Sequence, residues 1–267
     1  MARRAPAGSG PDPVTASLPF AGKVAVVTGG AHGIGRATAL RLARDGAAVA
    51  ILDIDGPAAA TVANGLRTDG STVQAWTIDC TDPAAVPGAF AQVRAAFGPI
   101  DILVNNVGQS SRQRMAEFSG DTLARLEFML TVNLRSCVLC TDAVVPGMRD
   151  RRGGRIVNVT SEAAFNGAPR NWDYAAAKSS ITGFTRAMAR ELAPFGVTVN
   201  AVAPGATRTR AMEAMPQDLL AQIVARIPMG RMGEPEEVAD VIAFFAGRQS
   251  SYVTGQTLLV NGGNWFL

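Results

Sequence analysis

The chain reads VAVVTGGAHGIG from Val24 to Gly35. Its first five residues are typical of a short buried strand, and glycines follow at positions 29, 30, 33 and 35. Glycine allows a tight turn and lets the backbone approach a bound group closely. A helix that begins at Gly33 would offer free N–H groups and the positive end of its dipole to a phosphate. A glycine cluster between a strand and a helix therefore predicts a dinucleotide-binding turn, whereas without that context it would be an ordinary turn.

Strand-like and helix-like segments alternate through the rest of the chain. The expected strands are Lys23–Thr28, Ala48–Asp53, Thr72–Asp79, Ile100–Asn105, Arg155–Val159, Val197–Val202 and Thr257–Val260. The expected helices are Gly33–Asp45, Gly56–Thr68, Ala84–Phe97, Thr122–Met148, Trp172–Leu192 and Glu236–Ala246. Nearly continuous Val/Ile/Leu strands that alternate with helices predict an α/β fold of the Rossmann type. In it, a doubly wound parallel sheet of about seven strands is covered by helices on both faces.

Asp53 ends the second expected strand, 18 residues after Gly35. An acid at this place can accept hydrogen bonds from both hydroxyls of an adenosine ribose, and it repels a 2′-phosphate. The next residues, Ile54, Asp55 and Gly56, add no base. The sequence therefore predicts NAD rather than NADP as cofactor. Asp79, at the end of the third expected strand, could bond the adenine amino group or simply precede a helix N-cap.

Tyr174 and Lys178 are one helical turn apart, in a chain with only two tyrosines and two lysines. Four residues on a helix place both side chains on one face. An ammonium so close lowers the pKa of a phenol from its usual value of ~10. Ser161 follows the expected strand Arg155–Val159, at the carboxyl end where such sheets bind ligands. One hydroxyl donor and one tuned phenol suit the interconversion of an alcohol and a ketone.

These motifs occur in an order that resembles the short-chain dehydrogenase/reductase family, in its compact single-domain branch, over about residues 20 to 263. The resemblance is carried by Thr28-Gly29-x-x-x-Gly33-Ile34-Gly35, Asn105-Asn106-Val107-Gly108, Asn133, Ser161, Tyr174-x-x-x-Lys178, Pro204-Gly205-x-x-x-Thr209 and Val260-Asn261-Gly262-Gly263. Two positions depart from the family pattern. Val107 stands where alanine is usual, and Thr207 stands where valine or isoleucine is common.

The resemblance implies a role for each catalytic candidate. Tyr174 would be the general acid/base, and Lys178 would tune it and hold the nicotinamide ribose. Ser161 would hydrogen-bond the substrate oxygen, and Asn133 would hold a water of a proton relay. The predicted cofactor-binding set is Gly29, His32, Gly33, Ile34, Gly35, Asp53, Ile54, Asp79, Cys80, Asn106, Val107, Gly108, Tyr174, Lys178, Pro204, Gly205, Thr207 and Thr209.

The substrate pocket is expected from segments after the fourth, fifth and sixth strands. Its candidates are Gln109, Ser110, Glu162, Phe165, Trp172, Met212 and Met215. Methionine and tryptophan favour a partly apolar pocket, although core packing would explain them as well. Residues 206–226 are expected to form a lid, in which Arg208 and Arg210 could meet a carboxylate or a phosphate or be plain solvated charges. None of these residues identifies the substrate.

The composition argues against several other classes of protein. The net charge of +3 is scattered and predicts no nucleic-acid partner, and no apolar run approaches the length of a membrane span. Residues 1–18 are expected to be a flexible tail, with residues 19–267 forming a single dinucleotide-binding and catalytic domain. Arg3-Arg4 lacks the apolar run of a signal peptide, so we expect a cytoplasmic protein. One histidine and three cysteines predict neither a metal site nor a disulfide framework.

Three functions remain open from the sequence. The favoured one is an NAD-dependent oxidoreductase that interconverts a secondary alcohol, or a hydroxyacyl group, and its ketone. The second is an NADPH-dependent 3-oxoacyl-thioester reductase, and the third is a dinucleotide-binding regulatory protein without turnover. The apolar character of Thr122–Met148 and Trp172–Leu192 on several faces also predicts a homo-oligomer, and the family resemblance favours a tetramer.

Overall fold

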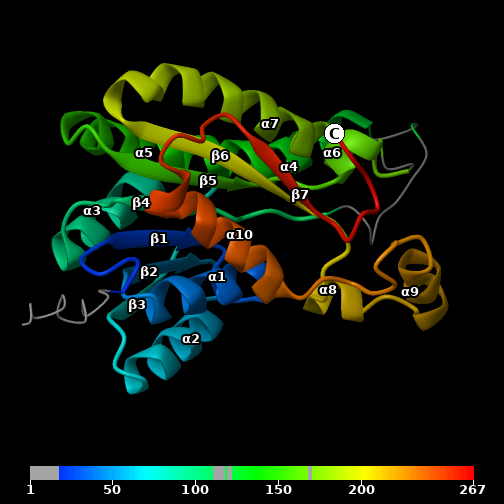
Figure 1. The fold of residues 1–267 in the computed structure, drawn as a ribbon, viewed down its shortest axis with the longest axis horizontal. Coiled ribbons are helices and arrows are strands. Elements are labelled where there is room, and N and C mark those ends of the chain that lie inside the picture. The colour runs from blue at the N-terminus through cyan, green and yellow to red at the C-terminus, as the bar shows by residue number, and fades with distance from the viewer. Residues whose placement is uncertain (1–17, 111–117, 119–121, 168–169) are drawn as a thin grey trace, which may run out of the picture.

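Parallel strands form one seven-stranded sheet in the order β3-β2-β1-β4-β5-β6-β7. The computed structural model describes residues 18–110, 118, 122–167 and 170–267 (Figure 1). Its strands are β1 (Val24–Thr28), β2 (Ala48–Asp53), β3 (Val73–Thr77), β4 (Ile102–Asn105), β5 (Gly154–Val159), β6 (Val197–Pro204) and β7 (Thr257–Val260). The strand order reverses between β1 and β4, and ligands of such sheets bind outside the carboxyl ends at that point. The predicted fold class is confirmed.

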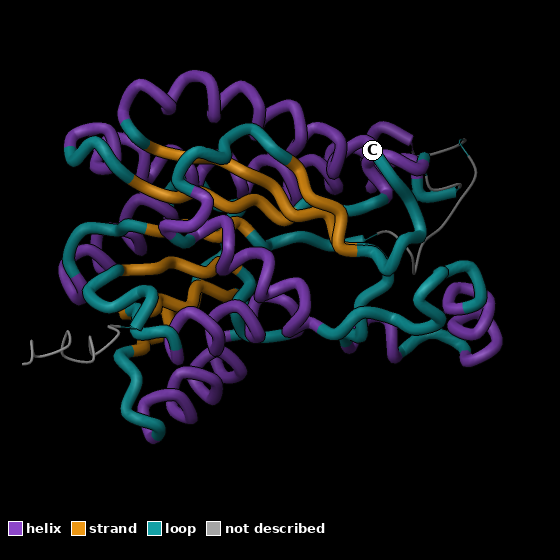
Figure 2. Tube along the Cα trace, viewed as in Figure 1, coloured by secondary structure: helices purple, strands orange, loops and turns teal. Residues whose placement is uncertain are grey.

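Helices cover both faces of the sheet (Figure 2). The first face is covered by α1 (Gly33–Arg44), α2 (Gly56–Thr68) and α10 (Pro235–Ala246). The second is covered by α3 (Ala85–Phe97), α5 (Ser136–Asp150) and α7 (Trp172–Leu192). Successive residues of a strand point to opposite faces. In β1, Val27 accordingly packs into the first core and Val26 into the second, so continuous apolar strands satisfy both layers.

The long helix predicted from Thr122 to Met148 is interrupted. The structure has α4 (Thr122–Leu130), then a π-helical turn η2 (Thr131–Arg135), then α5. The extra residue of a π turn changes which side chains face the protein, and such turns are frequent at functional sites. Asn133 lies within η2 and is fully buried.

The run Thr122–Asp150 is also the one helical run of the described chain that is long and apolar enough to cross a membrane. Its mean hydropathy over 18 residues is 1.4, and 44% of that window is buried inside the protein. Cys140, Val144 and Met148 pack on the sheet. A core helix passes the same test, and this packing accounts for its apolar residues.

Shorter elements join the main ones. They are α6 (Ala163–Asn166), η3 (Ala193–Phe195), α8 (Arg210–Glu213), α9 (Gln217–Val224) and η4 (Arg248–Ser250). The helices α8 and α9 lie within the segment predicted to be a lid, to one side of the sheet (Figure 1). Nearby, Ala206, Met212, Ile227 and Met232 form a separate small apolar cluster. Nearly all of the predicted tail lies outside the described residues, so the domain boundaries stay a prediction.

Candidate active site

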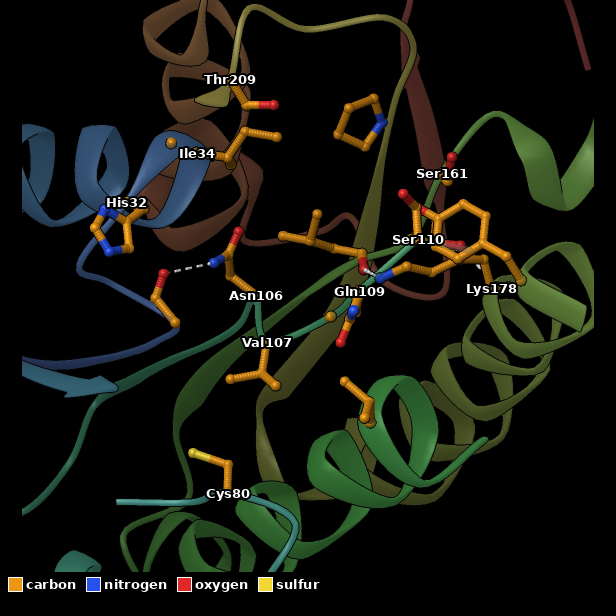
Figure 3. A pocket seen from close by; sticks show the side chains of 18 of the residues that line it. His32, Ile34, Cys80, Asn106, Val107, Gln109, Ser110, Ser161, Lys178 and Thr209 are labelled. Atoms are coloured by element: carbon orange, nitrogen blue, oxygen red, sulfur yellow. Dashed lines mark hydrogen bonds between the residues drawn. The ribbon is translucent and has the colours of Figure 1, made fainter. Parts of the chain in front are cut away.

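A cavity of about 840 Å³ lies at the carboxyl ends of the strands. Its walls come from the glycine turn after β1 and from the loops after β2, β3, β4, β5 and β6. His32 and Ile34 lie at one end of it, whereas Ser110, Ser161 and Lys178 gather at the other (Figure 3). We call these the nucleotide end and the catalytic end.

The nucleotide end is built by close backbone packing. A Cβ atom on Gly35 would lie 2.0 Å from the carbonyl oxygen of Gly29 and 2.5 Å from Nδ2 of Asn106, so only glycine fits. The Asn106 amide donates to the carbonyl oxygens of Thr28 (3.1 Å) and Gly29 (2.9 Å). These contacts fix the turn, and Gly33 and Ile34 from the first turn of α1 line the cavity. Backbone N–H groups in this position suit a pyrophosphate.

Asp53 is held by the backbone at the same end. Its carboxylate accepts hydrogen bonds from the N–H groups of Ala31 (2.9 Å) and Asp55 (2.9 Å), and the side chain is 8% exposed. A carboxylate has about four acceptor positions, so two remain for ribose hydroxyls. The ring of His32 bonds Asp55 (2.8 Å), and this bond is the main reason that the pKa of Asp55 is lowered. Arg210 contributes to the same shift and lines the same cavity.

Lys178 sits at the catalytic end and is 4% exposed. Its ammonium donates to the carbonyl oxygen of Val159 (2.9 Å) and lies 5.9 Å from the centre of the Tyr174 ring. Burial lowers the pKa of Lys178 to about 8. The ammonium form therefore predominates at neutral pH and places a positive charge beside the phenol.

Ser161 and the loop after β6 complete the catalytic end. The Ser161 oxygen accepts a hydrogen bond from the N–H of Ala163 (3.2 Å), so its own O–H remains available as a donor. Pro204, Gly205, Thr207 and Thr209 also line the cavity. Thr207 is buried, and its hydroxyl donates to the carbonyl oxygen of Gly205 (3.3 Å).

Asn133 lies behind the cavity lining rather than in it. Its amide group donates to the carbonyl oxygens of Gln109 (3.1 Å) and Met129 (3.0 Å), and its Oδ1 accepts from the N–H of Gln109 (3.2 Å). A Cβ atom on Gly108 would lie 2.7 Å from Oδ1 of Asn133 and 2.8 Å from Nζ of Lys178. Asn133 and Lys178 therefore flank the same point of the backbone, and the relay role of Asn133 stays a prediction.

Most of the predicted site residues lie together in the lining. All of the predicted cofactor set does so except Gly35, whose place is to let α1 approach the turn. Of the substrate candidates, Gln109, Ser110 and Met212 line the cavity, whereas Glu162, Phe165, Trp172 and Met215 are not in its described lining. Trp172 packs instead against Phe118, with a ring distance of 4.9 Å, and beneath Arg125. The role of each stays a prediction.

The sequence did not point to several other lining residues. They are Ile78, Thr81, Phe128, Thr131, Val132, Val159 and Thr160. Most are apolar or small residues next to strand ends or in the π turn, and no motif marks them. The π turn carries Thr131 and Val132 to the cavity, and nothing in the local composition announces it.

Residues 29–264 match the family model described as enoyl-(acyl carrier protein) reductase. The chain belongs to the short-chain dehydrogenase/reductase family. Members of this family are oxidoreductases that bind a nicotinamide dinucleotide.

Three relatives align with nearly the whole length of this chain. It is 40% identical to the (2S)-[(R)-hydroxy(phenyl)methyl]succinyl-CoA dehydrogenase subunit BbsD of Thauera aromatica, over 90% of this chain and 96% of the relative. It is 37% identical to the 3-oxoacyl-[acyl-carrier-protein] reductase FabG of Salmonella typhimurium, over 94% and 100%. Identity to the enzyme of the same name from Thermotoga maritima is 39%, over 91% and 97%.

The residues present fit a dinucleotide. The glycine turn leaves no room for a side chain, α1 directs N–H groups toward the cavity, and Asp53 keeps acceptor positions for a ribose. Gly108 likewise leaves open the space between the cavity and the Lys178 ammonium. No group of three or more His, Cys, Asp or Glu side chains in the described ranges could hold a metal ion.

Proposed function

We propose that this protein is an NAD-dependent oxidoreductase that interconverts a secondary alcohol, or a hydroxyacyl group, and the corresponding ketone. The observation that carries the proposal is the meeting of Ser161, Tyr174 and Lys178 at the catalytic end of one cavity whose other end suits a dinucleotide. A regulatory protein that only bound a dinucleotide would need the nucleotide end but not this set.

The chemistry divides between proton and hydride. Tyr174 accepts the hydroxyl proton in oxidation and returns it to the carbonyl oxygen in reduction. Ser161 donates its O–H to the same oxygen and orients the substrate. Lys178 stabilises the ionised phenol by its charge. A nicotinamide held in this cavity would supply the hydride acceptor for oxidation and the hydride donor for reduction.

Asp53 supports NAD as the cofactor, because its buried carboxylate would face a 2′-phosphate. One observation favours a second candidate, an NADPH-dependent 3-oxoacyl-thioester reductase. Arg210, from the lid, lines the same cavity and acts on Asp55, so a cation is close to the adenosine end. Two of the named relatives are 3-oxoacyl-[acyl-carrier-protein] reductases.

The deciding experiment titrates NAD and NADP separately into the protein by calorimetry. We expect NAD to bind at least ~10-fold more tightly, a difference of about 1.4 kcal/mol. A screen of secondary alcohols and hydroxyacyl thioesters with both oxidised cofactors, followed at the absorbance of the reduced nicotinamide, then tests turnover. Tighter binding of NADP together with activity on a 3-oxoacyl thioester would establish the second candidate instead.

We also expect a soluble cytoplasmic protein that assembles as a homotetramer with D2 symmetry and acts on a small molecule. Leu123 on α4 and Val138 on α5 are large apolar side chains that stay exposed in the single chain, and neither lines the cavity. An interface would cover such side chains. Light scattering at micromolar concentration should give the mass of a tetramer, and the mass of a monomer would contradict this expectation.

A further inference from the structure

Glu162 directly follows Ser161, but its carboxylate meets the C-terminal segment. The side chain is 7% exposed. It accepts hydrogen bonds from the side-chain amide of Asn264 (3.0 Å and 3.2 Å to its two oxygens) and from that of Asn261 (3.3 Å). These partners are about a hundred residues away in sequence, and Figure 1 shows the C-terminus beside α6, which begins one residue after Glu162.

The backbone around Glu162 is part of the catalytic end. The N–H of Glu162 donates to the carbonyl oxygen of Pro204 (3.0 Å), and the next N–H, of Ala163, donates to the Ser161 hydroxyl oxygen (3.2 Å). The Ser161 turn is therefore fastened to the loop after β6. Any displacement of Glu162 moves the hydroxyl that is expected to meet the substrate.

The C-terminal segment touches the loop after β6 as well. A Cβ atom on Gly205 would lie 2.7 Å from Cβ of Asn261 and 3.2 Å from a carboxylate oxygen of Glu162. The N–H of Gly205 donates to the carbonyl oxygen of Val260 (2.9 Å). These distances show that Glu162, Asn261 and Gly205 are closely packed. Gly205 also lines the cavity, so this packing reaches the site.

The same segment reaches the end of the predicted lid. Asn261 accepts a hydrogen bond from the N–H of Gly263 (3.2 Å), which closes a turn with positive φ at Gly262 (+62°) and Gly263 (+84°). The carbonyl oxygen of Gly262 accepts from the N–H of Met229 (3.2 Å). The C-terminal turn, residues 261–264, therefore contacts three segments: residues 161–163, the loop after β6 at Gly205, and the chain after α9 at Met229.

We propose that Glu162 is a positioning residue of the catalytic end, which acts by locking Asn261 and Asn264 of the C-terminal turn against the Ser161 turn. The proposal rests on the proposed function, because it concerns the place of Ser161 in that reaction. A carboxylate only accepts hydrogen bonds, and both asparagine side chains donate to it. An amide in its place would set a donor against these donors and leave buried polar groups unsatisfied.

The test is Glu162→Gln, which keeps the shape of the side chain and removes one acceptor. A small displacement of a reacting group is enough to slow a reaction by ~10- to 100-fold, so we expect kcat to fall within this range while KM changes less than about threefold. The reciprocal double variant Glu162→Gln/Asn264→Asp supplies an acceptor opposite the new amide and should recover most of the lost kcat. Recovery by the second change identifies the contact between residues 162 and 264 as the cause of the lost kcat.

Asp101→Asn is the matched control. Asp101 is half-buried and accepts from the N–H of Val24 (3.0 Å) at the amino ends of the strands, far from the cavity. We expect it to lower the midpoint of thermal unfolding without changing kcat. A wild-type kcat in Glu162→Gln, or a double variant no faster than the single one, would overturn the proposal.

Hydrogen exchange keeps this inference separate from the proposed function. In the cofactor-free protein, Glu162→Gln should speed amide exchange at both Ala163 and Gly205 by about tenfold or more, and Asp101→Asn should not. Absence of turnover in the wild-type protein with every substrate of the screen would refute the proposed function alone. Unchanged exchange at both amides would overturn the positioning role, whatever the enzyme's substrate.

Discussion

The nucleotide end of the cavity is held by close packing of the glycine turn and by side chains that bond its main chain, whereas the catalytic end depends on contacts between side chains far apart in the sequence. At the first, a carbonyl oxygen of Gly29 occupies the space that a Cβ of Gly35 would need. At the second, Lys178 bonds the end of β5, and Glu162 bonds the C-terminal turn. Two residues of the predicted lid, Ala206 and Met212, form a small apolar cluster with Ile227 and Met232, separate from the two large cores.

Because of this difference, the two ends of the cavity should tolerate different substitutions. At the nucleotide end a methyl group on Gly35 collides with a main-chain oxygen of Gly29, which cannot rotate away. At the catalytic end a new side chain alters contacts that other side chains make, so the pocket can take new shapes while the sheet stays intact. We therefore expect specificity for substrate to come from the catalytic end and the predicted lid rather than from the nucleotide end.

The largest effect should follow from Tyr174→Phe, which leaves both ends of the cavity in place and removes one oxygen. General acid–base catalysis is typically worth ~10²- to 10⁴-fold, and we expect kcat to fall within that range with NAD affinity unchanged. Steady-state kinetics on the best substrate of the screen, with calorimetry for NAD, measures both quantities.

The control is the chain's other tyrosine, Tyr252, which is fully exposed. Tyr252→Phe should keep the wild-type rate. If Tyr174→Phe retained more than about a tenth of that rate, Tyr174 would not be the acid/base.

The second prediction concerns the charge buried at the catalytic end. The pKa of Lys178 is about 8 in the folded protein and 10.5 in an unfolded chain. Between these pH values the unfolded chain binds a proton at this lysine that the folded protein does not, so Lys178 contributes a rise of the free energy of unfolding with pH. Above pH 9 this rise is opposed by Cys137, because burial raises the pKa of its thiol from 9.0 to about 12, so the Lys178 contribution is measured as the difference between wild type and variant. This contribution to the free energy of unfolding is at most about 3 kcal/mol, and it is absent below pH 8, where the buried lysine is charged.

Lys178→Met should abolish this rise, as measured by urea unfolding of the cofactor-free protein at pH 7, 8.5 and 10. Lys23→Met is the matched control, because Lys23 is the only other lysine and its side chain is 50% exposed. The control should keep the wild-type difference between pH 7 and pH 10. Parallel curves for wild type and Lys178→Met would mean that Lys178 does not carry a buried charge.

Features with a local sequence pattern could be predicted, whereas contacts between distant segments could not. Short apolar strands, the glycine turn and Asp53 are local patterns with a physical reason, and each predicted strand appears in the sheet with ends shifted by three residues or fewer. The π turn around Asn133 and the contact of Glu162 with Asn264 have no local pattern. In the first, Asn133 bonds the main chain of Gln109, 24 positions earlier, and the second joins residues about a hundred positions apart. The sequence predicts Glu162 as a substrate-pocket residue because it lies in the segment after the fifth strand, and only the fold reveals its bond to Asn264.

The third prediction tests the rigidity of the nucleotide end. Gly35→Ala places a methyl group 2.0 Å from the Gly29 oxygen, so the turn or α1 must shift. Such overpacking typically costs ~1–3 kcal/mol of stability, and we expect NAD affinity to fall by at least ~10-fold. Gly65→Ala in α2 is the control, because a Cβ there meets no atom within 4 Å. It should raise stability by up to about 1 kcal/mol, since alanine favours a helix over glycine. Equal behaviour of the two variants would refute the packing argument.

The smallest effect is expected at Asp53, where charge rather than packing decides. The wild type should prefer NAD over NADP by at least ~10-fold, about 1.4 kcal/mol. Asp53→Ala removes both the ribose acceptor and the charge that repels a 2′-phosphate, so the preference for NAD should narrow to less than about threefold.

Asp53 also accepts hydrogen bonds from the N–H groups of Ala31 and Asp55, so a loss of NAD affinity in Asp53→Ala has two causes, the lost ribose contact and a disturbed turn. Asp53→Asn separates the two causes, since it keeps one acceptor oxygen and removes the charge. We expect it to improve NADP binding while NAD binding falls less than in Asp53→Ala, as measured by calorimetry at low ionic strength and again at 0.5 M salt. Added salt should weaken the discrimination of the wild type and leave that of Asp53→Asn nearly unchanged, because screening acts on the charge alone. A preference for NAD that survives in Asp53→Asn at both salt concentrations would mean that the shape of the nucleotide end, and not the Asp53 charge, selects the cofactor.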